Sequence, residues 1–199
     1  RFGRYRHWDP RLLRGMGLAG KKLGIVGYGR IGRAVAQRAR TFGMKIVFTD
    51  PSCEKHDQLP DDTRCVELEE LLQVSDIVTL HCPYTPETHH IIDHDAFIKM
   101  KETAYFINTA RGKLMDENAL YDALVNGDIA GAGLDVYENE PDFVQELAEL
   151  NNVVMLPHIG SATYETRDAM AELAAKNVIA IFGGNEPLTP VNQPKETRK

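Results

Sequence analysis

The chain has 199 residues and a formal net charge of −6, and 43% of its residues are hydrophobic while 26% are charged. This length suffices for one large domain with its own core, and the composition is ordinary for a globular protein. The acidic balance argues against nucleic acid or an anionic membrane as a partner, and no apolar run reaches the roughly 20 residues of a bilayer span.

Short apolar strands alternate with amphipathic helices along most of the sequence. The first apolar run ends in glycines, and the segment after it repeats apolar residues with the period of a helix. The pattern predicts strands at residues 23–26, 45–48, 76–80, 104–107, 131–134 and 152–156, and helices at 30–42, 67–73, 116–126 and 163–183.

This alternation indicates the α/β class, with a doubly wound parallel sheet that is covered by helices on both faces. We expect a single domain over residues 18–184, which ends with the long helix at 163–183. Residues 1–17 are predicted to form an N-terminal linker segment, and residues 185–199 a polar tail. Because the sequence starts at an arginine, we expect it to be a piece of a longer protein.

The turn between the first strand and the first helix reads Gly27-Tyr28-Gly29-Arg30-Ile31-Gly32. This glycine pattern, between a strand and a helix, is typical of a dinucleotide site. Gly27 allows the tight turn, Gly29 lets the backbone approach a pyrophosphate, and Gly32 lets helix and strand pack closely. The sequence therefore predicts a Rossmann-type cofactor domain, and a purely structural glycine turn is the alternative.

Asp50 ends the second predicted strand, near the ~20-residue offset expected for an acid that binds the adenosine ribose. A carboxylate at this position accepts hydrogen bonds from the ribose hydroxyls and repels a 2′-phosphate. We therefore expect NAD rather than NADP as the cofactor.

Other candidate residues also follow predicted strands closely, at the edge where ligands of open parallel sheets bind. Cys82, Pro83 and Thr88 belong either to a wall beside the adenosine half of the cofactor or to an ordinary rigid loop. Asp135 could accept from the nicotinamide carboxamide, or it could cap a turn. The whole set expected at this edge is Gly27, Asp50, Pro83, Arg111, Asp135 and His158.

Two side chains are suited to act on a small acid. Arg111, within Asn108-Thr109-Ala110-Arg111-Gly112, presents a fork that matches a carboxylate, although a surface salt bridge is the commoner role of an arginine. His158, which follows Pro157, can give a proton to a ketone and take it back. A carboxylate beside it would favour the imidazolium form, and Glu138 and Glu140 both qualify. This set predicts hydride transfer between a nicotinamide and a small 2-hydroxy or 2-keto acid.

The three cysteines, Cys53, Cys65 and Cys82, lack the spacing of a disulfide framework. We expect reduced thiols and a cytoplasmic protein. His89 and His90 are adjacent, which is a poor chelate, and we expect no metal.

The sequence resembles the D-isomer-specific 2-hydroxyacid dehydrogenases over residues 18–192, and most closely their glyoxylate and hydroxypyruvate reductases. The resemblance rests on residues 23–32, 108–112, 133–141 and 157–161, with Trp8-Asp9-Pro10 and Gly20-Lys21-Lys22. It implies that Arg111, Glu140 and His158 are catalytic, which decides between Glu140 and Glu138. It also implies NAD contacts at Arg30, Ile31, Asp50, Cys82, Thr109, Ala110, Arg111, Asp135, His158, Gly160 and Ser161.

Members of this family carry a further segment ahead of this point, which together with the last helix forms a substrate domain. The resemblance therefore implies a single cofactor domain without its substrate domain, with little activity alone and assembled as a homodimer. The family's fold is shared by the C-terminal-binding corepressors, which are NAD-sensing scaffolds with a tryptophan in the histidine loop. The corresponding residues 159–163 contain none.

Overall fold

The computed structural model describes residues 10, 14–53 and 59–192. It divides into two compact units, Arg1–His158 and Ile159–Lys199. Trp8, Asp9 and most of the predicted linker lie outside the described residues, as does the end of the predicted tail. The predicted domain boundaries remain predictions.

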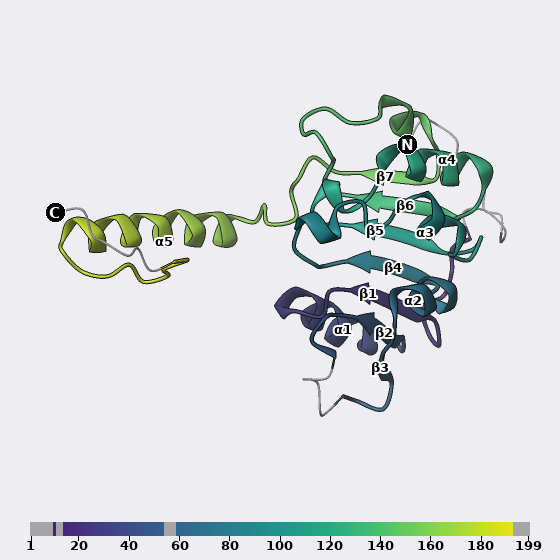
Figure 1. Ribbon diagram of the computed structural model, residues 1–199, viewed down its shortest axis with the longest axis horizontal. Helices are drawn as coiled ribbons and strands as arrows, with labels where there is room; N and C mark the ends of the chain where they lie inside the picture. The colour runs from purple at the N-terminus through teal and green to yellow at the C-terminus, as the bar shows by residue number, and fades with distance from the viewer. Residues whose placement is uncertain (1–9, 11–13, 54–58, 193–199) are drawn as a thin grey trace. The chain divides into compact units, whose positions relative to one another are not determined.

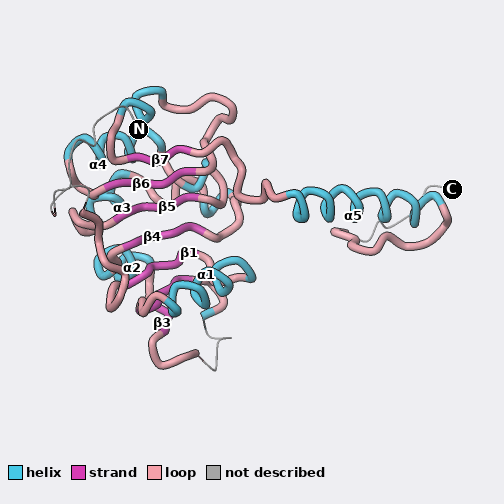
Figure 2. Tube along the Cα trace, turned by 180° about the vertical axis from the view of Figure 1, so that it is seen from behind, coloured by secondary structure: helices cyan, strands magenta, loops and turns pink. Residues whose placement is uncertain are grey.

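The first unit contains a seven-stranded sheet in the order β3-β2-β1-β4-β5-β6-β7 (Figure 1). Every neighbouring pair is parallel, which confirms the predicted doubly wound α/β architecture. Figure 2 shows the strands side by side as one sheet. They are β1 (Lys22–Val26), β2 (Lys45–Thr49), β3 (Thr63–Cys65), β4 (Ile77–Leu80), β5 (Tyr105–Asn108), β6 (Gly131–Leu134) and β7 (Val153–Met155).

In the described residues of the first unit, the helices are α1 (Arg30–Thr41), α2 (Leu68–Val74), α3 (His94–Ile98) and α4 (Glu117–Asn126), with the short 3-10 turns η2 (Pro86–Thr88), η3 (Gly112–Leu114) and η4 (Gln145–Glu149). All predicted strands and helices are present, with ends within one residue of the prediction. The sequence patterns missed β3 and α3, because elements of three and five residues are too short to show a period.

Two apolar cores lie on opposite faces of the sheet, because successive strand side chains point to opposite faces. Ile25 of β1 and Phe48 of β2 pack with Ala36 of α1 in the smaller core. The neighbouring residues Val26 and Val47 belong to the larger core, which residues of α2, α3 and α4 complete. Both faces of the sheet are therefore covered, and the strand ends are left as the surface on which a site can form.

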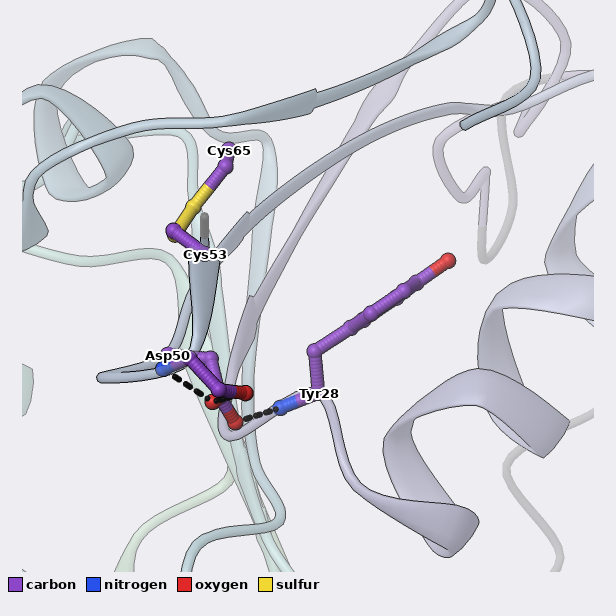
Figure 3. The surroundings of a disulfide bond; sticks show 5 residues. Tyr28, Asp50, Cys53 and Cys65 are labelled. Carbon is purple, nitrogen blue, oxygen red and sulfur yellow. Dashed lines mark hydrogen bonds between the residues drawn. A yellow bond between two sulfur atoms is a disulfide. The ribbon is translucent and has the colours of Figure 1, made fainter. Parts of the chain in front are cut away.

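A disulfide joins Cys53, in the loop after β2, to Cys65 at the end of β3 (Figure 3). The expectation of three reduced thiols is wrong for this pair, and Cys82 is the free cysteine of the described residues. Cys65 stands opposite Phe48 in the parallel register. The Cα atoms of Cys53 and Cys65 lie 6.0 Å apart, within disulfide range. The pairing depends on β3, which is why the sequence spacing did not reveal it.

The second unit consists of α5 (Tyr164–Phe182) and the segment after it. Thr163 caps the helix by accepting from the backbone N–H of Thr166. Asn177 exchanges two hydrogen bonds with Thr189, which fixes the following segment against the helix. No helix in the described part of the chain is long and apolar enough to cross a membrane.

Candidate active site

A cleft of about 1310 Å³ lies in the first unit, where α1 begins and where β4, β5, β6 and β7 end. It brings together residues that lie up to 128 positions apart (158 − 30) in the sequence. Its lining includes nine of the predicted site residues: Arg30, Ile31, Cys82, Pro83, Thr109, Ala110, Arg111, Glu140 and His158.

The other predicted residues do not line this cleft. Gly27, Gly29 and Gly32 form the turn at its α1 end, and Asp50 is bonded to that turn. Asp135 is buried at the end of β6. Gly160 and Ser161 belong to the second unit.

The glycine turn has the shape that a dinucleotide needs. Gly27 has φ +92°, and a Cβ on it would collide with the backbone of Cys82; a Cβ on Gly32 would collide with the carbonyl of Gly27. Gly29 is the N-cap of α1, without a side-chain cap and without an acid in the first turn. The N-terminal amides of α1 are thus not satisfied by a side-chain cap, and the helix dipole favours an anion there. These residues fit the pyrophosphate of a dinucleotide.

Asp50 connects the end of β2 to the glycine turn (Figure 3). Its Oδ2 accepts from the backbone N–H of Tyr28 at 2.8 Å, and its Oδ1 accepts from the backbone N–H of Ser52 at 2.8 Å. The Tyr28 ring stacks on Phe48 with centroids 3.9 Å apart. The carboxylate is therefore held in one orientation beside the turn.

The loop after β4 is shaped by Thr88. Its hydroxyl donates to the carbonyl of Pro83 at 2.9 Å and accepts from the backbone N–H of Thr85 at 2.7 Å. This side chain is engaged with its own loop, whereas Cys82 lines the cleft. Burial raises the pKa of the Cys82 thiol to about 11, and the charge of Asp50 adds to that effect. Cys82 is therefore a neutral thiol at physiological pH.

Arg111 lies on a tight loop whose backbone is held by the Asn108 side chain. The buried Asn108 side chain accepts from the backbone N–H of Ala110 and donates to the carbonyl of Arg111, both at 3.0 Å. A Cβ on Gly112 would collide with the backbone of Tyr137. The loops that carry Arg111 and Glu140 are therefore in direct backbone contact, while the Arg111 side chain itself is exposed.

Glu140 and His158 form a hydrogen-bonded pair in the lining of the same cleft. Nδ1 of His158 lies 2.7 Å from Oε2 of Glu140, and the backbone N–H of Tyr137 donates to Oε1 at 3.0 Å. The hydrogen bond from His158 holds the pKa of Glu140 below its ordinary value, and the Tyr137 amide contributes in the same direction. An ionised carboxylate only accepts, so Nδ1 is the donor and Nε2 is the nitrogen that remains for chemistry.

Glu138, the rival of Glu140 in the sequence, has a different partner. Its Oε1 lies 3.0 Å from Nε2 of His90. His89, His90 and Glu138 have possible metal-ligand atoms within 4.8 Å of one another. However, the two imidazole rings are stacked, with centroids 3.9 Å apart and planes 25° apart, so their in-plane lone pairs do not point to one ion. The His90–Glu138 contact was missed at the sequence level, because nothing in the local pattern relates residues 48 positions apart.

Comparison with known proteins also indicates a dinucleotide-binding domain. The family model for the D-isomer specific 2-hydroxyacid dehydrogenase NAD binding domain matches residues 1–160. The glyoxylate reductase of Thermococcus litoralis is 50% identical over 186 residues, which cover 94% of this chain and 56% of that protein.

Solved structures of similar proteins have the same fold as this chain. The TT0316 protein from Thermus thermophilus is 45% identical with a TM-score of 0.89, over 96% of this chain and 60% of that one. A NADPH-dependent glyoxylate/hydroxypyruvate reductase from Sinorhizobium meliloti, in complex with NADP and malonate, is 36% identical with a TM-score of 0.80, over 90% and 56%. The chain thus spans little more than half the length of these relatives, and it belongs to the D-isomer-specific 2-hydroxyacid dehydrogenase family, of which it contains the NAD-binding domain.

Proposed function

We propose that this chain is the cofactor-binding part of a dehydrogenase that transfers hydride between NAD(H) and a small 2-hydroxy or 2-keto acid. The observation that carries the proposal is that one cleft contains Arg111, the Glu140–His158 pair and the start of α1. The name of the Thermococcus relative, a glyoxylate reductase, supports a small keto acid as substrate.

In this proposal each side chain has a separate task. The guanidinium of Arg111 binds the substrate carboxylate. Nε2 of His158 gives a proton to the carbonyl oxygen during reduction and accepts it during oxidation. Glu140 fixes the tautomer of His158 and compensates its positive charge. When bound, the reduced nicotinamide supplies the hydride that reaches the carbonyl carbon.

The cofactor would lie with its pyrophosphate at the start of α1 and its adenosine ribose at Asp50. A fixed carboxylate at this position disfavours a 2′-phosphate, so we propose NAD rather than NADP. The same proposal includes cofactor contacts from Thr109, Asp135, Gly160 and Ser161. It also includes a homodimer and a cytoplasmic location.

Two measurements test it. Calorimetric titration of this chain should give tighter binding of NADH than of NADPH. Reduction of glyoxylate and hydroxypyruvate should then be assayed on this chain and on a chain extended to the length of the relatives, and we expect turnover by the extended chain and little by this one. NADH binding without turnover of any 2-keto acid by the extended chain would overturn the enzymatic proposal and favour an NAD-sensing scaffold.

A further inference from the structure

We propose that Glu117 is a positioning residue for the acid/base pair: its buried carboxylate holds the loop 138–144 so that Glu140 meets His158. The inference rests on the proposed function, in which Glu140 and His158 are that pair. Neither the glycine motif nor the strand-end residues point to Glu117, which reads in the sequence as an ordinary acid at the start of a helix.

Glu117 is a buried charge with two backbone partners. It is the first residue of α4 and only 2% exposed. Its Oε1 accepts from the backbone N–H of Glu138, and its Oε2 accepts from the backbone N–H of Val144 at 2.9 Å. A buried carboxylate is costly unless its oxygens are hydrogen-bonded, and bonds to a charged acceptor are the stronger kind. One side chain therefore ties down both ends of the loop that carries Glu140.

The support from which Glu117 reaches the loop is rigid. Leu120, Ala123 and Leu124 of α4 belong to the larger core. Asp116 caps the same helix by accepting from the backbone N–H groups of Asn118 and Ala119. A carboxylate at the first turn is also favoured by the helix dipole. The position of Glu117 is thus set by the sheet and its covering helices.

Between the two anchored ends, Glu140 is presented in one orientation. The backbone N–H of Asp142 donates to the carbonyl of Asn139 at 3.0 Å, which closes the turn around Glu140. The Glu140 carboxylate then meets Nδ1 of His158 at 2.7 Å. Without the Glu117 carboxylate, two amides lose their acceptor, and the loop is free to carry Glu140 away from the imidazole.

The decisive variant is Glu117→Gln, which keeps the size of the side chain but provides one acceptor oxygen instead of two. Asp116→Asn is the matched control, because it removes one negative charge from the adjacent position while asparagine remains a good N-cap. The readout, in this chain, is the long-range proton–nitrogen NMR spectrum of the His158 ring, which reports which nitrogen carries the proton. We expect the Nδ1–H form in the unsubstituted chain and in Asp116→Asn, and a mixture of forms in Glu117→Gln, as in Glu140→Gln.

A second variant approaches the same contact from the other side. Val144 has φ −64°, which lies in the range of proline, so Val144→Pro removes the amide donor, and the ring carbon that replaces the N–H breaks the 2.9 Å contact with Oε2 of Glu117 without changing the Glu117 residue. It should change the His158 spectrum in the same way, and it keeps the test valid if Glu117→Gln does not fold.

Activity provides a separate check. In the extended chain, Glu117→Gln should lower kcat by about tenfold or more, yet by less than the ~10²–10⁴-fold that general acid catalysis supplies, with the Kd for NADH unchanged. An unchanged His158 spectrum in both folded variants overturns the inference, whatever the activity. Altered spectra in chains that never turn over 2-keto acids support the role of Glu117 in holding the loop and overturn the proposed function instead.

Discussion

Both carboxylate oxygens of Glu140 are engaged, Oε2 with Nδ1 of His158 at 2.7 Å and Oε1 with the backbone N–H of Tyr137 at 3.0 Å. Tyr137 in turn donates from its hydroxyl to the carbonyl of Leu156 at 2.8 Å, two residues before His158. The loop after β6 and the end of β7 are therefore joined twice, once through the Glu140–His158 pair and once through Tyr137.

The pair should make stability depend on pH. The His158 hydrogen bond lowers the pKa of Glu140 in the folded chain. The ionised Glu140 therefore contributes to the free energy of unfolding above its unfolded pKa of about 4.3, and this contribution is lost as pH falls through the lower folded pKa. Glu140→Gln should therefore cost at most about 1 kcal/mol at pH 6, since the pair is partly exposed to solvent. Urea unfolding at several pH values tests this, and a difference that grows below pH 4 would contradict it.

Asp50 should determine the choice of cofactor. Asp50→Ala removes a hydrogen-bond partner of the ribose and also removes the repulsion of a 2′-phosphate. NADH binding should therefore weaken by roughly 10–100-fold, which corresponds to one or two hydrogen bonds to a charged group. NADPH binding should change less. Calorimetry with both cofactors measures the ratio. Asp61→Asn, at an exposed carboxylate outside the cleft, is the control. An unchanged preference in Asp50→Ala would exclude Asp50 as the discriminating residue.

Gly112→Ala should damage both halves of the site. The new Cβ would meet the backbone of Tyr137, so either the Arg111 loop or the Glu140 loop must move. We expect a loss of about 1–3 kcal/mol in the free energy of unfolding, the usual cost of overpacking. Gly17→Ala is the matched control, since a Cβ at Gly17 meets no atom within 4 Å. Equal effects of the two substitutions in urea unfolding would refute the backbone contact.

Asp76 should stabilise the centre of the sheet. Partial burial would raise the pKa of Asp76, but the backbone N–H of Lys22 at 2.8 Å and Nζ of Lys101 at 3.0 Å together lower it. Asp76→Asn should cost about 1–3 kcal/mol at pH 7. The sign of the shift requires this cost to shrink as pH falls through the folded pKa, below the ordinary value of about 3.9. Unfolding curves at pH 7 and pH 3 would disprove the assignment if the cost were the same at both.

The number of reactive thiols per chain should report the Cys53–Cys65 disulfide. With Cys53 joined to Cys65, a thiol reagent in denaturant should find one thiol per chain, and three after reduction. In the native chain, burial keeps Cys82 neutral, so its reaction should be slow at pH 8. Three thiols before reduction would contradict the Cys53–Cys65 bond and restore the expectation of reduced thiols.

The sequence was sufficient for the elements that have a strong pattern. Apolar runs such as Leu23–Val26 are buried on both faces of the sheet and are bounded by turn residues, so their ends were predicted to within one residue. The strand Thr63–Cys65 has three residues, including the exposed Arg64, and the helix His94–Ile98 has a single turn capped by Asp93. Neither is long enough for periodicity to distinguish it from a loop.

The site was predictable in its residue types but not in its connections. Strand ends identified Arg111 and His158 as neighbours in space, because parallel strands end at one edge of the sheet. The residues alone left Glu138 as a rival of Glu140, and the family resemblance decided between them. The bond from Glu117 to Val144 spans 27 positions and follows no period, so only the folded backbone reveals it.

The strand order also decides the order in which a nascent chain acquires the parts of the cleft. β1 is made first yet lies inside the sheet. β2 and β3 extend the sheet to one edge and β4 to β7 extend it to the other, after which His158 completes the cleft. Domains generally fold as they leave the ribosome, from the N-terminal end. A chain halted before residue 158 would therefore contain the glycine turn and Asp50 while it still lacked the His158 part of the cleft.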